Sequence, residues 1–223
     1  MTYCSCSNDY SIKVPEGFIV FISGVPGVGK TTISYELLKA CTDFRIIEET
    51  DLIREVLRGY NSFMKCEFGD EIQFLFDKIE IYDHMKFLSY GEAKQQCEYM
   101  KKSFEKIIAR QQRKGIPSII NGVHIIPEVL DGILGNQNIV FVNLYIRNKC
   151  DMFQRFKERD PEKYTLGNMT IAHQTNIDLH SNTQKLAESK GNLFYNVDVT
   201  TSSVEDTVRE VIACIKKRIG NKN

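Results

Sequence analysis

Short runs of apolar, β-branched residues alternate along the chain with longer segments whose apolar side chains recur every three or four positions. The short runs predict buried strands, and the longer segments predict helices with one apolar face. The expected strands are residues 18–23, 44–48, 118–120, 138–146 and 193–197. The expected helices are residues 30–40, 52–58, 70–85, 93 to about 114, 147–159 and 169–190, with a last helix beginning after residue 202.

Two of the expected helices have especially regular patterns. In the first, apolar residues at alternating spacings of four and three share one helical face: Ala93, Cys97, Met100, Phe104 and Ile107. In the last, Ser202 and Glu205 predict an N-terminal capping box. The apolar face of that last helix is expected to comprise Val204, Val208, Val211, Ile215 and Ile219.

The alternation of strands and helices predicts the fold class. Helices that connect parallel strands cross the faces of the sheet, so the pattern indicates an α/β fold with three layers, α/β/α. The sheet is expected to have five strands, mostly parallel. A length of 223 residues fits one domain over residues 1–223, with a polar N-terminal extension over residues 1–16.

Composition and charge narrow the possible function classes. Hydrophobic residues make up 42% and charged residues 26%, which excludes a wholly disordered chain. The 29 basic and 29 acidic side chains give zero net charge, so we do not expect nucleic acid as a partner. The longest apolar runs, such as residues 18–22, are far shorter than the ~20 residues that span a bilayer, so we expect no membrane partner.

The seven cysteines are scattered through the sequence, and their odd number favours reduced thiols in a cytoplasmic protein. Cys4 and Cys6 lie close together near the N-terminus. No second Cys/His pair at zinc-ligand spacing accompanies them, so we interpret them as part of the N-terminal extension rather than as a metal site.

The most informative segment follows the first expected strand and matches the phosphate-loop pattern GxxxxGK[ST]. It comprises Gly24, Val25, Pro26, Gly27, Val28, Gly29, Lys30, Thr31 and Thr32. The glycines allow backbone N–H groups to approach phosphate oxygens, and the following helix adds its dipole. Lys30 is expected to reach the β- and γ-phosphates, and the Thr31 hydroxyl to bind Mg²⁺. The segment therefore predicts binding of a nucleoside triphosphate with Mg²⁺.

A second segment predicts the acceptor side of a phosphoryl transfer. Asp51 follows the second expected strand, and ligands bind at the carboxyl ends of strands in open parallel sheets. Asp51 is expected to accept the proton of an acceptor hydroxyl or to orient a metal-bound water. Arg54 and Arg58, on the same side of the next helix, are expected to hold an anionic group of the acceptor. The alternative is that Asp51 only caps that helix, although capping and catalysis are compatible.

The third expected strand ends at Asn121, where P-loop enzymes usually carry an acid that holds the magnesium shell. Because an amide carries no charge, either Asp51 takes over the metal or the site is weaker. His124 lies three residues further on, where a loop at the strand end would face the cleft, and it is a further expected substrate contact. The alternative for His124 is a structural role.

Arginines after the fourth strand indicate a lid over residues of about 148–170. Arg155 and Arg159 are four residues apart and share a helical face. Such arginines can stabilise the charge that develops on a transferring phosphoryl group. The alternative is a solvated helix in which Glu158 and Asp160 are the partners of these arginines.

Together these motifs carry a family resemblance. The phosphate loop, residues 50–58 (TDLIREVLR) and residues 121–127 (NGVHIIP) occur in this order, and with them the chain resembles the 2-phosphoglycerate kinase-like group of small P-loop kinases. The resemblance implies a nucleoside-monophosphate-kinase-like fold, MgATP as donor and a small hydroxylated anion as acceptor. It implies that Lys30 and Thr31 bind the triphosphate and metal, that Asp51 and Arg54 serve the acceptor, and that Arg155 or Arg159 belongs to the lid.

Three functions follow from the sequence. The first is transfer of the γ-phosphoryl of MgATP to a hydroxyl of a small anionic metabolite. The second is a nucleoside or polynucleotide 5′-kinase. The third, suggested by Asn121, is an ATP-binding regulator with little catalysis. Acceptor-dependent release of ADP separates the third from the other two.

Overall fold

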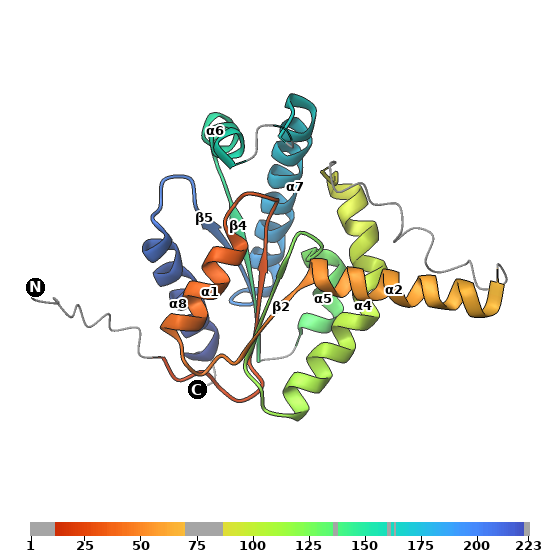
Figure 1. Ribbon diagram of the computed structural model, residues 1–223. Helices are drawn as coiled ribbons and strands as arrows, with labels where there is room; N and C mark the ends of the chain where they lie inside the picture. Colours follow the sequence, from red (N-terminus) through yellow and green to blue (C-terminus); the bar gives the residue numbers. More distant parts are fainter. Residues whose placement is uncertain (1–11, 70–86, 136–137, 160–161, 163, 221–223) are drawn as a thin grey trace, which may run out of the picture.

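The computed structural model of the chain describes residues 12–69, 87–135, 138–159, 162 and 164–220. Its centre is one five-stranded sheet in the order β2-β3-β1-β4-β5 (Figure 1). The strands are β1 (Ile19–Ser23), β2 (Ile46–Glu49), β3 (Ser118–Gly122), β4 (Ile139–Tyr145) and β5 (Phe194–Asp198). Every neighbouring pair is parallel, so the predicted α/β sheet is confirmed.

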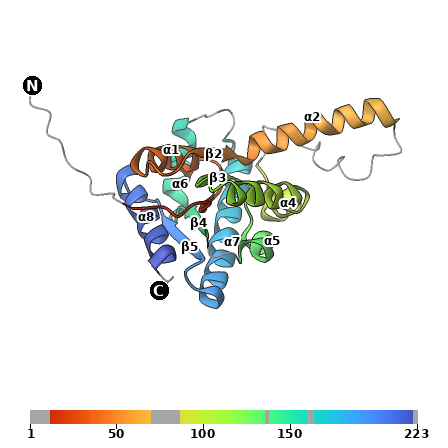
Figure 2. The same cartoon turned by 90° about the horizontal axis from the view of Figure 1, so that it is seen from below.

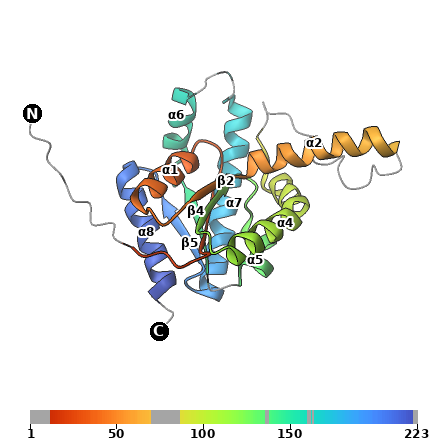
Figure 3. The same ribbon diagram turned by 60° about the horizontal axis from the view of Figure 1, so that its bottom comes forward.

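Helices cover both faces of this sheet, which gives the three predicted layers (Figures 1 and 3). The helices are α1 (Lys30–Ala40), α2 (Thr50–Phe68), α4 (Tyr90–Arg113), α5 (Pro127–Leu134), α6 (Lys149–Arg159), α7 (Leu166–Lys190) and α8 (Val204–Gly220). Helices α1 and α8 pack on one face, and α4, α5 and α7 lie over the other. Helix α2 projects away from the body of the molecule (Figure 2).

Alternation along the strands divides the core into two clusters. In β1, Val20 and Ile22 point into the cluster that contains α1 and α8. Ile19 and Phe21 point into the cluster that contains α4 and α5, where Phe21 meets Phe104 edge to face at 6.4 Å between ring centroids. All of these side chains are buried, as expected for a parallel strand covered on both faces.

The register brings the ends of the three central strands to one edge of the sheet. Ser23, the last residue of β1, is aligned with Gly122 on β3 and with Asn143 on β4. The loops that follow the strands therefore leave from the same side, where ligands bind in open α/β sheets.

Some predicted element boundaries were wrong. Helix α2 runs to Phe68 instead of ending at residue 58, and α5 was not predicted. The last helix is capped by Ser203, whose Oγ accepts a hydrogen bond from the backbone N–H of Asp206 at 3.0 Å. Ser202 instead donates its hydroxyl to the carbonyl of Asp198 at 3.1 Å.

Several predictions fall on residues outside those that the structure describes: the helix over residues 70–85, Cys4 and Cys6, Asp160 as a partner of the arginines, and most of the N-terminal extension. The end of that extension does pack, since Val14 is buried and its N–H donates to Asp43 Oδ2 at 2.8 Å. Among the described residues, no helix combines the length and the apolar character needed to cross a membrane.

Candidate active site

The phosphate loop forms the turn between β1 and α1, and two of its glycines are required there. At Gly24 (φ +145°) an added Cβ would lie 2.6 Å from the carbonyl oxygen of Leu144. Gly29 has a left-handed backbone with φ +95° and directly precedes α1. Because α1 begins at Lys30, the positive end of its helix dipole points toward the loop, which is a favourable site for an anion.

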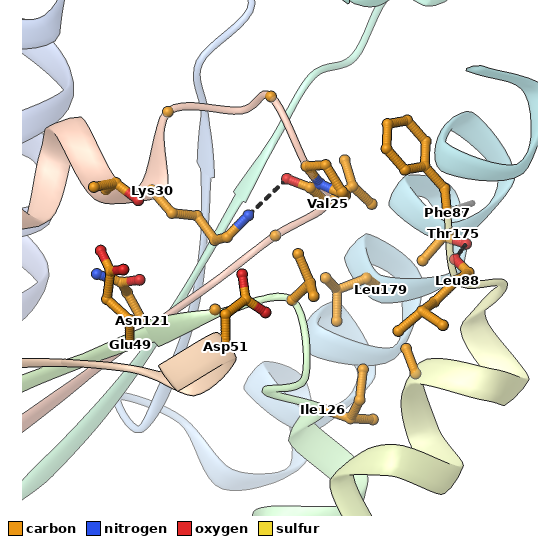
Figure 4. A pocket seen from close by; sticks show the side chains of 18 of the residues that line it. Val25, Lys30, Glu49, Asp51, Phe87, Leu88, Asn121, Ile126, Thr175 and Leu179 are labelled. Atoms are coloured by element: carbon orange, nitrogen blue, oxygen red, sulfur yellow. Dashed lines mark hydrogen bonds between the residues drawn. The ribbon is translucent and has the colours of Figure 1, made fainter. Parts of the chain in front are cut away.

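Lys30 lies inside the curve of the loop. Its Nζ donates a hydrogen bond to the carbonyl oxygen of Val25 at 2.8 Å (Figure 4). The side chain is largely buried, so the ammonium group is held close to the backbone that surrounds it. A triphosphate bound by the loop would meet this positive charge directly.

A cavity of about 560 Å³ opens beside the phosphate loop. Every loop residue from Gly24 to Thr32 lines it except Val28, which is buried in the hydrophobic core. The rest of the described lining comes from Glu49, Asp51, Asn121, Gly122 and Val123 at the sheet edge and from Phe87, Leu88, Ala93, Ile126, Tyr164, Thr175 and Leu179 on the far wall. The cavity thus has a phosphate-binding side and a predominantly apolar side (Figure 4).

Two carboxylates lie at the sheet edge of this cavity. Asp51 is in the first turn of α2, and its side chain is 62% exposed. Glu49 ends β2 and is aligned with Asn121 on β3. Figure 4 shows Glu49 and Asn121 close together near Lys30. No role was predicted for Glu49, although its place at the end of a strand is the same signal that identified Asp51.

Asn121 is linked by hydrogen bonds to the start of α1, directly after the phosphate loop. Its Nδ2 donates to Ser34 Oγ at 3.0 Å, and the Ser34 hydroxyl donates to the carbonyl of Lys30 at 2.8 Å. Because the Ser34 proton is already used, the oxygen needs a donor as its neighbour, and an amide can supply one whereas a carboxylate cannot. This geometry explains why an amide fits where an acid was expected.

The oxygen atoms that line the cavity could hold a magnesium ion only if a nucleotide supplied further ligands. The Thr31 hydroxyl and the carboxylates of Glu49 and Asp51 line the cavity, and such oxygen atoms are the ligands that Mg²⁺ prefers. In the part of the chain that the structure describes, no group of three or more His, Cys, Asp or Glu side chains could hold a metal ion alone. This agrees with an ion that takes most of its ligands from phosphates and water.

Arg54 and His124 meet behind the cavity wall instead of lining it. The Arg54 guanidinium donates from Nη1 to His124 Nε2 at 3.2 Å, and His124 Nδ1 lies 3.1 Å from Thr50 Oγ1. Arg54 is 4% and His124 0% exposed. The expectation that His124 faces the cleft is therefore wrong, and Arg54 does not reach the cavity as an anion-binding side chain. Arg58 also lies outside the lining and bonds to Glu55 at 2.9 Å.

Helix α6, in the expected lid, packs against the phosphate loop. A Cβ added at Gly27 would lie 2.2 Å from Cε1 of Phe156. Arg155 points elsewhere, because its guanidinium donates to the carbonyls of Val199 and Thr200 at 2.5 and 2.7 Å. It therefore ties α6 to the loop between β5 and α8 and does not line the cavity. The side chain of Arg159 lies outside the described residues.

Comparison with known proteins supports the predicted resemblance, although no family model matches the chain. A 2-phosphoglycerate kinase of Methanococcus vannielii is 28% identical over 92% of this chain and 66% of its own length. The chain resembles the 2-phosphoglycerate kinases. A mevalonate-3-phosphate 5-kinase of Thermoplasma acidophilum is 31% identical over 56% of the chain and 60% of that protein. The chain spans about two thirds, or 66%, of the length of the curated 2-phosphoglycerate kinases that match most of it.

Solved structures confirm the fold. A gluconokinase from Sinorhizobium meliloti 1021 superposes with a TM-score of 0.54 at 16% identity, covering 94% of this chain and 97% of that one. A shikimate kinase from Acinetobacter baumannii, in complex with shikimate, gives a TM-score of 0.50 at 17% identity, covering 94% and 96%. The chain therefore has the fold of small P-loop kinases, as its resemblance to the 2-phosphoglycerate kinases implied.

Proposed function

We propose that this protein transfers the γ-phosphoryl group of MgATP to a hydroxyl group of a small metabolite. The observation that carries the proposal is that a complete phosphate loop and two carboxylates line the same cavity. The similarity to kinases that act on small metabolites supports it. Catalysis would come mainly from positioning and from neutralising charge on the phosphoryl group.

Each group of residues around the cavity would have its own role in the reaction. Backbone N–H groups of the loop and the Lys30 ammonium would hold the β- and γ-phosphates. Asp51 would accept the proton of the acceptor hydroxyl as its oxygen attacks the γ-phosphorus. The new O–P bond forms as the bond to the β–γ bridging oxygen breaks, and ADP leaves. A magnesium ion, held by Thr31 with Glu49 or Asp51 nearby, would neutralise phosphate charge when bound.

The acceptor we propose to test first is a small anionic hydroxy compound of the 2-phosphoglycerate type. Two relatives are named for phosphorylated hydroxy compounds as substrates, 2-phosphoglycerate and mevalonate 3-phosphate. Positive charge is present on both sides of the wall: Lys30 lines the cavity together with Asp51, and the Arg54 guanidinium behind the wall lies 4.0 Å from Asp51 Oδ1.

A nucleoside is the second candidate acceptor, because one wall of the cavity is apolar. Leu88, Ile126 and Leu179 line the side opposite the phosphate loop. A flat or apolar body would bury surface against these side chains, whereas a small double anion would not.

The test measures ADP release from MgATP, alone and with 2-phosphoglycerate, other phosphorylated hydroxy acids and nucleosides. We expect one class of acceptor to stimulate release, and Lys30→Ala to lower the stimulated rate by roughly a hundredfold or more. Tight ATP binding without stimulation by any acceptor would contradict the proposal and favour an ATP-binding regulator. Equal activity of wild type and Lys30→Ala would remove the phosphate loop from the reaction.

A further inference from the structure

The buried cluster behind Asp51 is not explained by binding of ATP or of an acceptor. It joins three side chains: Thr50 and Arg54 from α2, and His124 from the loop after β3. We propose that His124 is a positioning residue that braces the first turn of α2 in its neutral form, protonated at Nδ1, and thereby fixes Asp51 at the edge of the cavity. The role of Asp51 in this statement rests on the proposed function.

The hydrogen-bond partners determine which ring nitrogen carries the proton. An arginine can only donate, so the contact from Arg54 Nη1 at 3.2 Å requires Nε2 of His124 to be the acceptor. The proton of the neutral ring must then lie on Nδ1, which donates to Thr50 Oγ1 at 3.1 Å. A doubly protonated ring would place two donors, both charged, against each other at the Arg54 contact.

The spacing on α2 explains why one imidazole can reach both partners. Thr50 and Arg54 are four residues apart and lie one above the other on the same face of the helix. The ring of His124 therefore spans the whole first turn of α2. Because Asp51 belongs to this turn, fixing its two ends also fixes the backbone from which the Asp51 carboxylate extends.

Asp51 is also close to the cluster itself. Its Oδ1 lies 3.5 Å from His124 Nδ1 and 4.0 Å from Arg54 Nη1. The positive end of the Nδ1–H bond and the guanidinium both attract the carboxylate. They favour a position of Asp51 next to the buried cluster and beside the cavity, in preference to one extended into solvent.

Burial supports the neutral ring. His124 is enclosed completely and lies against the Arg54 guanidinium, so a positively charged ring there would lose its contact with water beside another positive charge. The backbone leaves little room for movement, because Gly122 passes directly beside Thr50. A Cβ at Gly122 would lie 1.7 Å from Thr50 Oγ1.

The first experiment observes the tautomer in the wild-type protein by ¹⁵N NMR of the histidine rings between pH 6 and 8. The chain has four histidines, and the signals that disappear in His124→Gln assign the ring in question. We expect a neutral ring with its proton on Nδ1 throughout this range. A ring protonated at Nε2, or at both nitrogens, could not accept from Arg54 and would overturn the proposal.

The second experiment measures hydrogen exchange of backbone amides and steady-state kinetics in His124→Gln and His124→Asn. Neither side chain can reach both Thr50 and Arg54. We expect exchange in the first turns of α2 to become roughly tenfold faster while exchange in the central strands is unchanged. His180→Gln is the matched control, because His180 lies on α7, where it contacts Tyr145; it should leave exchange in α2 as in the wild type.

The kinetic prediction separates positioning from general stability. With an acceptor that stimulates the wild type, kcat should fall roughly tenfold to a hundredfold while the KM for ATP stays within about twofold. Faster exchange spread evenly over the sheet, or parallel losses in kcat and ATP binding, would indicate a merely structural histidine. If no acceptor stimulates the wild type, the proposed function fails, and the tautomer and exchange measurements still decide the role of His124 in holding α2.

Discussion

Adding one methyl group at Gly122 tests how firmly α2 is held against the sheet. In Gly122→Ala the new Cβ would lie 1.7 Å from Oγ1, 2.7 Å from Cβ and 2.8 Å from Cγ2 of Thr50. Thr50 is fully buried, and its Oγ1 is bonded to His124. The hydroxyl would have to retreat by roughly 1.3 Å before its contact reached 3.0 Å. The substitution therefore pushes the first turn of α2, and Asp51 with it, away from β3.

Overpacking of this kind costs about 1–3 kcal/mol of unfolding free energy. For a chain of 223 residues, each kcal/mol lowers Tm by about 2–4 °C. We therefore expect Gly122→Ala to melt several degrees below the wild type and to lose acceptor-dependent turnover at temperatures where it is still folded. Thermal unfolding followed by circular dichroism and the ADP-release assay measure the two effects.

Gly59 provides the control on the same helix. No atom lies within 4 Å of a Cβ added there, so Gly59→Ala should stabilise the protein by about 1 kcal/mol through helix propensity. A Gly122→Ala protein that unfolds within about 0.5 kcal/mol of the wild type and keeps full turnover would refute the close contact between Thr50 and β3.

Three further predictions follow from the same geometry. Asn121→Asp loses the hydrogen bond donated to Ser34, so its free energy of unfolding, measured in urea, should be about 1 kcal/mol lower than that of the wild type. An unchanged urea midpoint would contradict this. Gly27→Ala combines a strained φ of +86° with a contact of 2.2 Å to Phe156, so it should weaken ATP binding by calorimetry, whereas Gly132→Ala, with open space, should not. Because the pKa of His124 is about 4 in the folded protein and near 6.5 when unfolded, the unfolded state gains a proton first as the pH falls. Stability should therefore decrease between about pH 6.5 and 4, by up to roughly 1.4 kcal/mol per pH unit, and His124→Gln should flatten that slope.

The phosphate loop was predictable because its chemistry is local. All of its residues are consecutive, and the strand before it and the helix after it are recognisable from their own patterns. The structure accordingly places eight of the nine loop residues around the cavity, and the exception, Val28, has an apolar side chain that belongs in the core. Sheet class and helix order follow from the same local patterns.

Helix α2 shows where local patterns give the wrong orientation. Its buried residues are polar, Thr50, Arg54 and Asn61, while Leu52 and Val56 are about two-thirds exposed, at 66% and 64%. An amphipathic pattern ordinarily predicts the reverse. Ile53 and Leu57 do pack against the core, but Thr50 and Arg54 also turn inward, because they meet His124. His124 is 70 residues from Arg54 in sequence and carries no sign of this contact in its own neighbourhood. Asp51 and Arg54 do lie close together on α2, as their spacing predicted. Whether this side of the helix meets the cavity or the sheet depends on His124, which only folding brings next to it.

The same reasoning explains the missing acid at the end of β3. Asn121 is 87 residues from Ser34, yet its amide completes a chain of hydrogen bonds that ends on the carbonyl of Lys30, the first residue of α1. The strand end therefore holds the helix that carries the phosphate loop, a role that needs a donor. Negative charge is present one strand further along, where Glu49 is aligned with Asn121 and Asp51 follows two residues later. An amide at position 121 is thus consistent with a competent site. Asn121 holds α1 through hydrogen bonds, and the negative charge comes from Glu49 on the neighbouring strand and from Asp51.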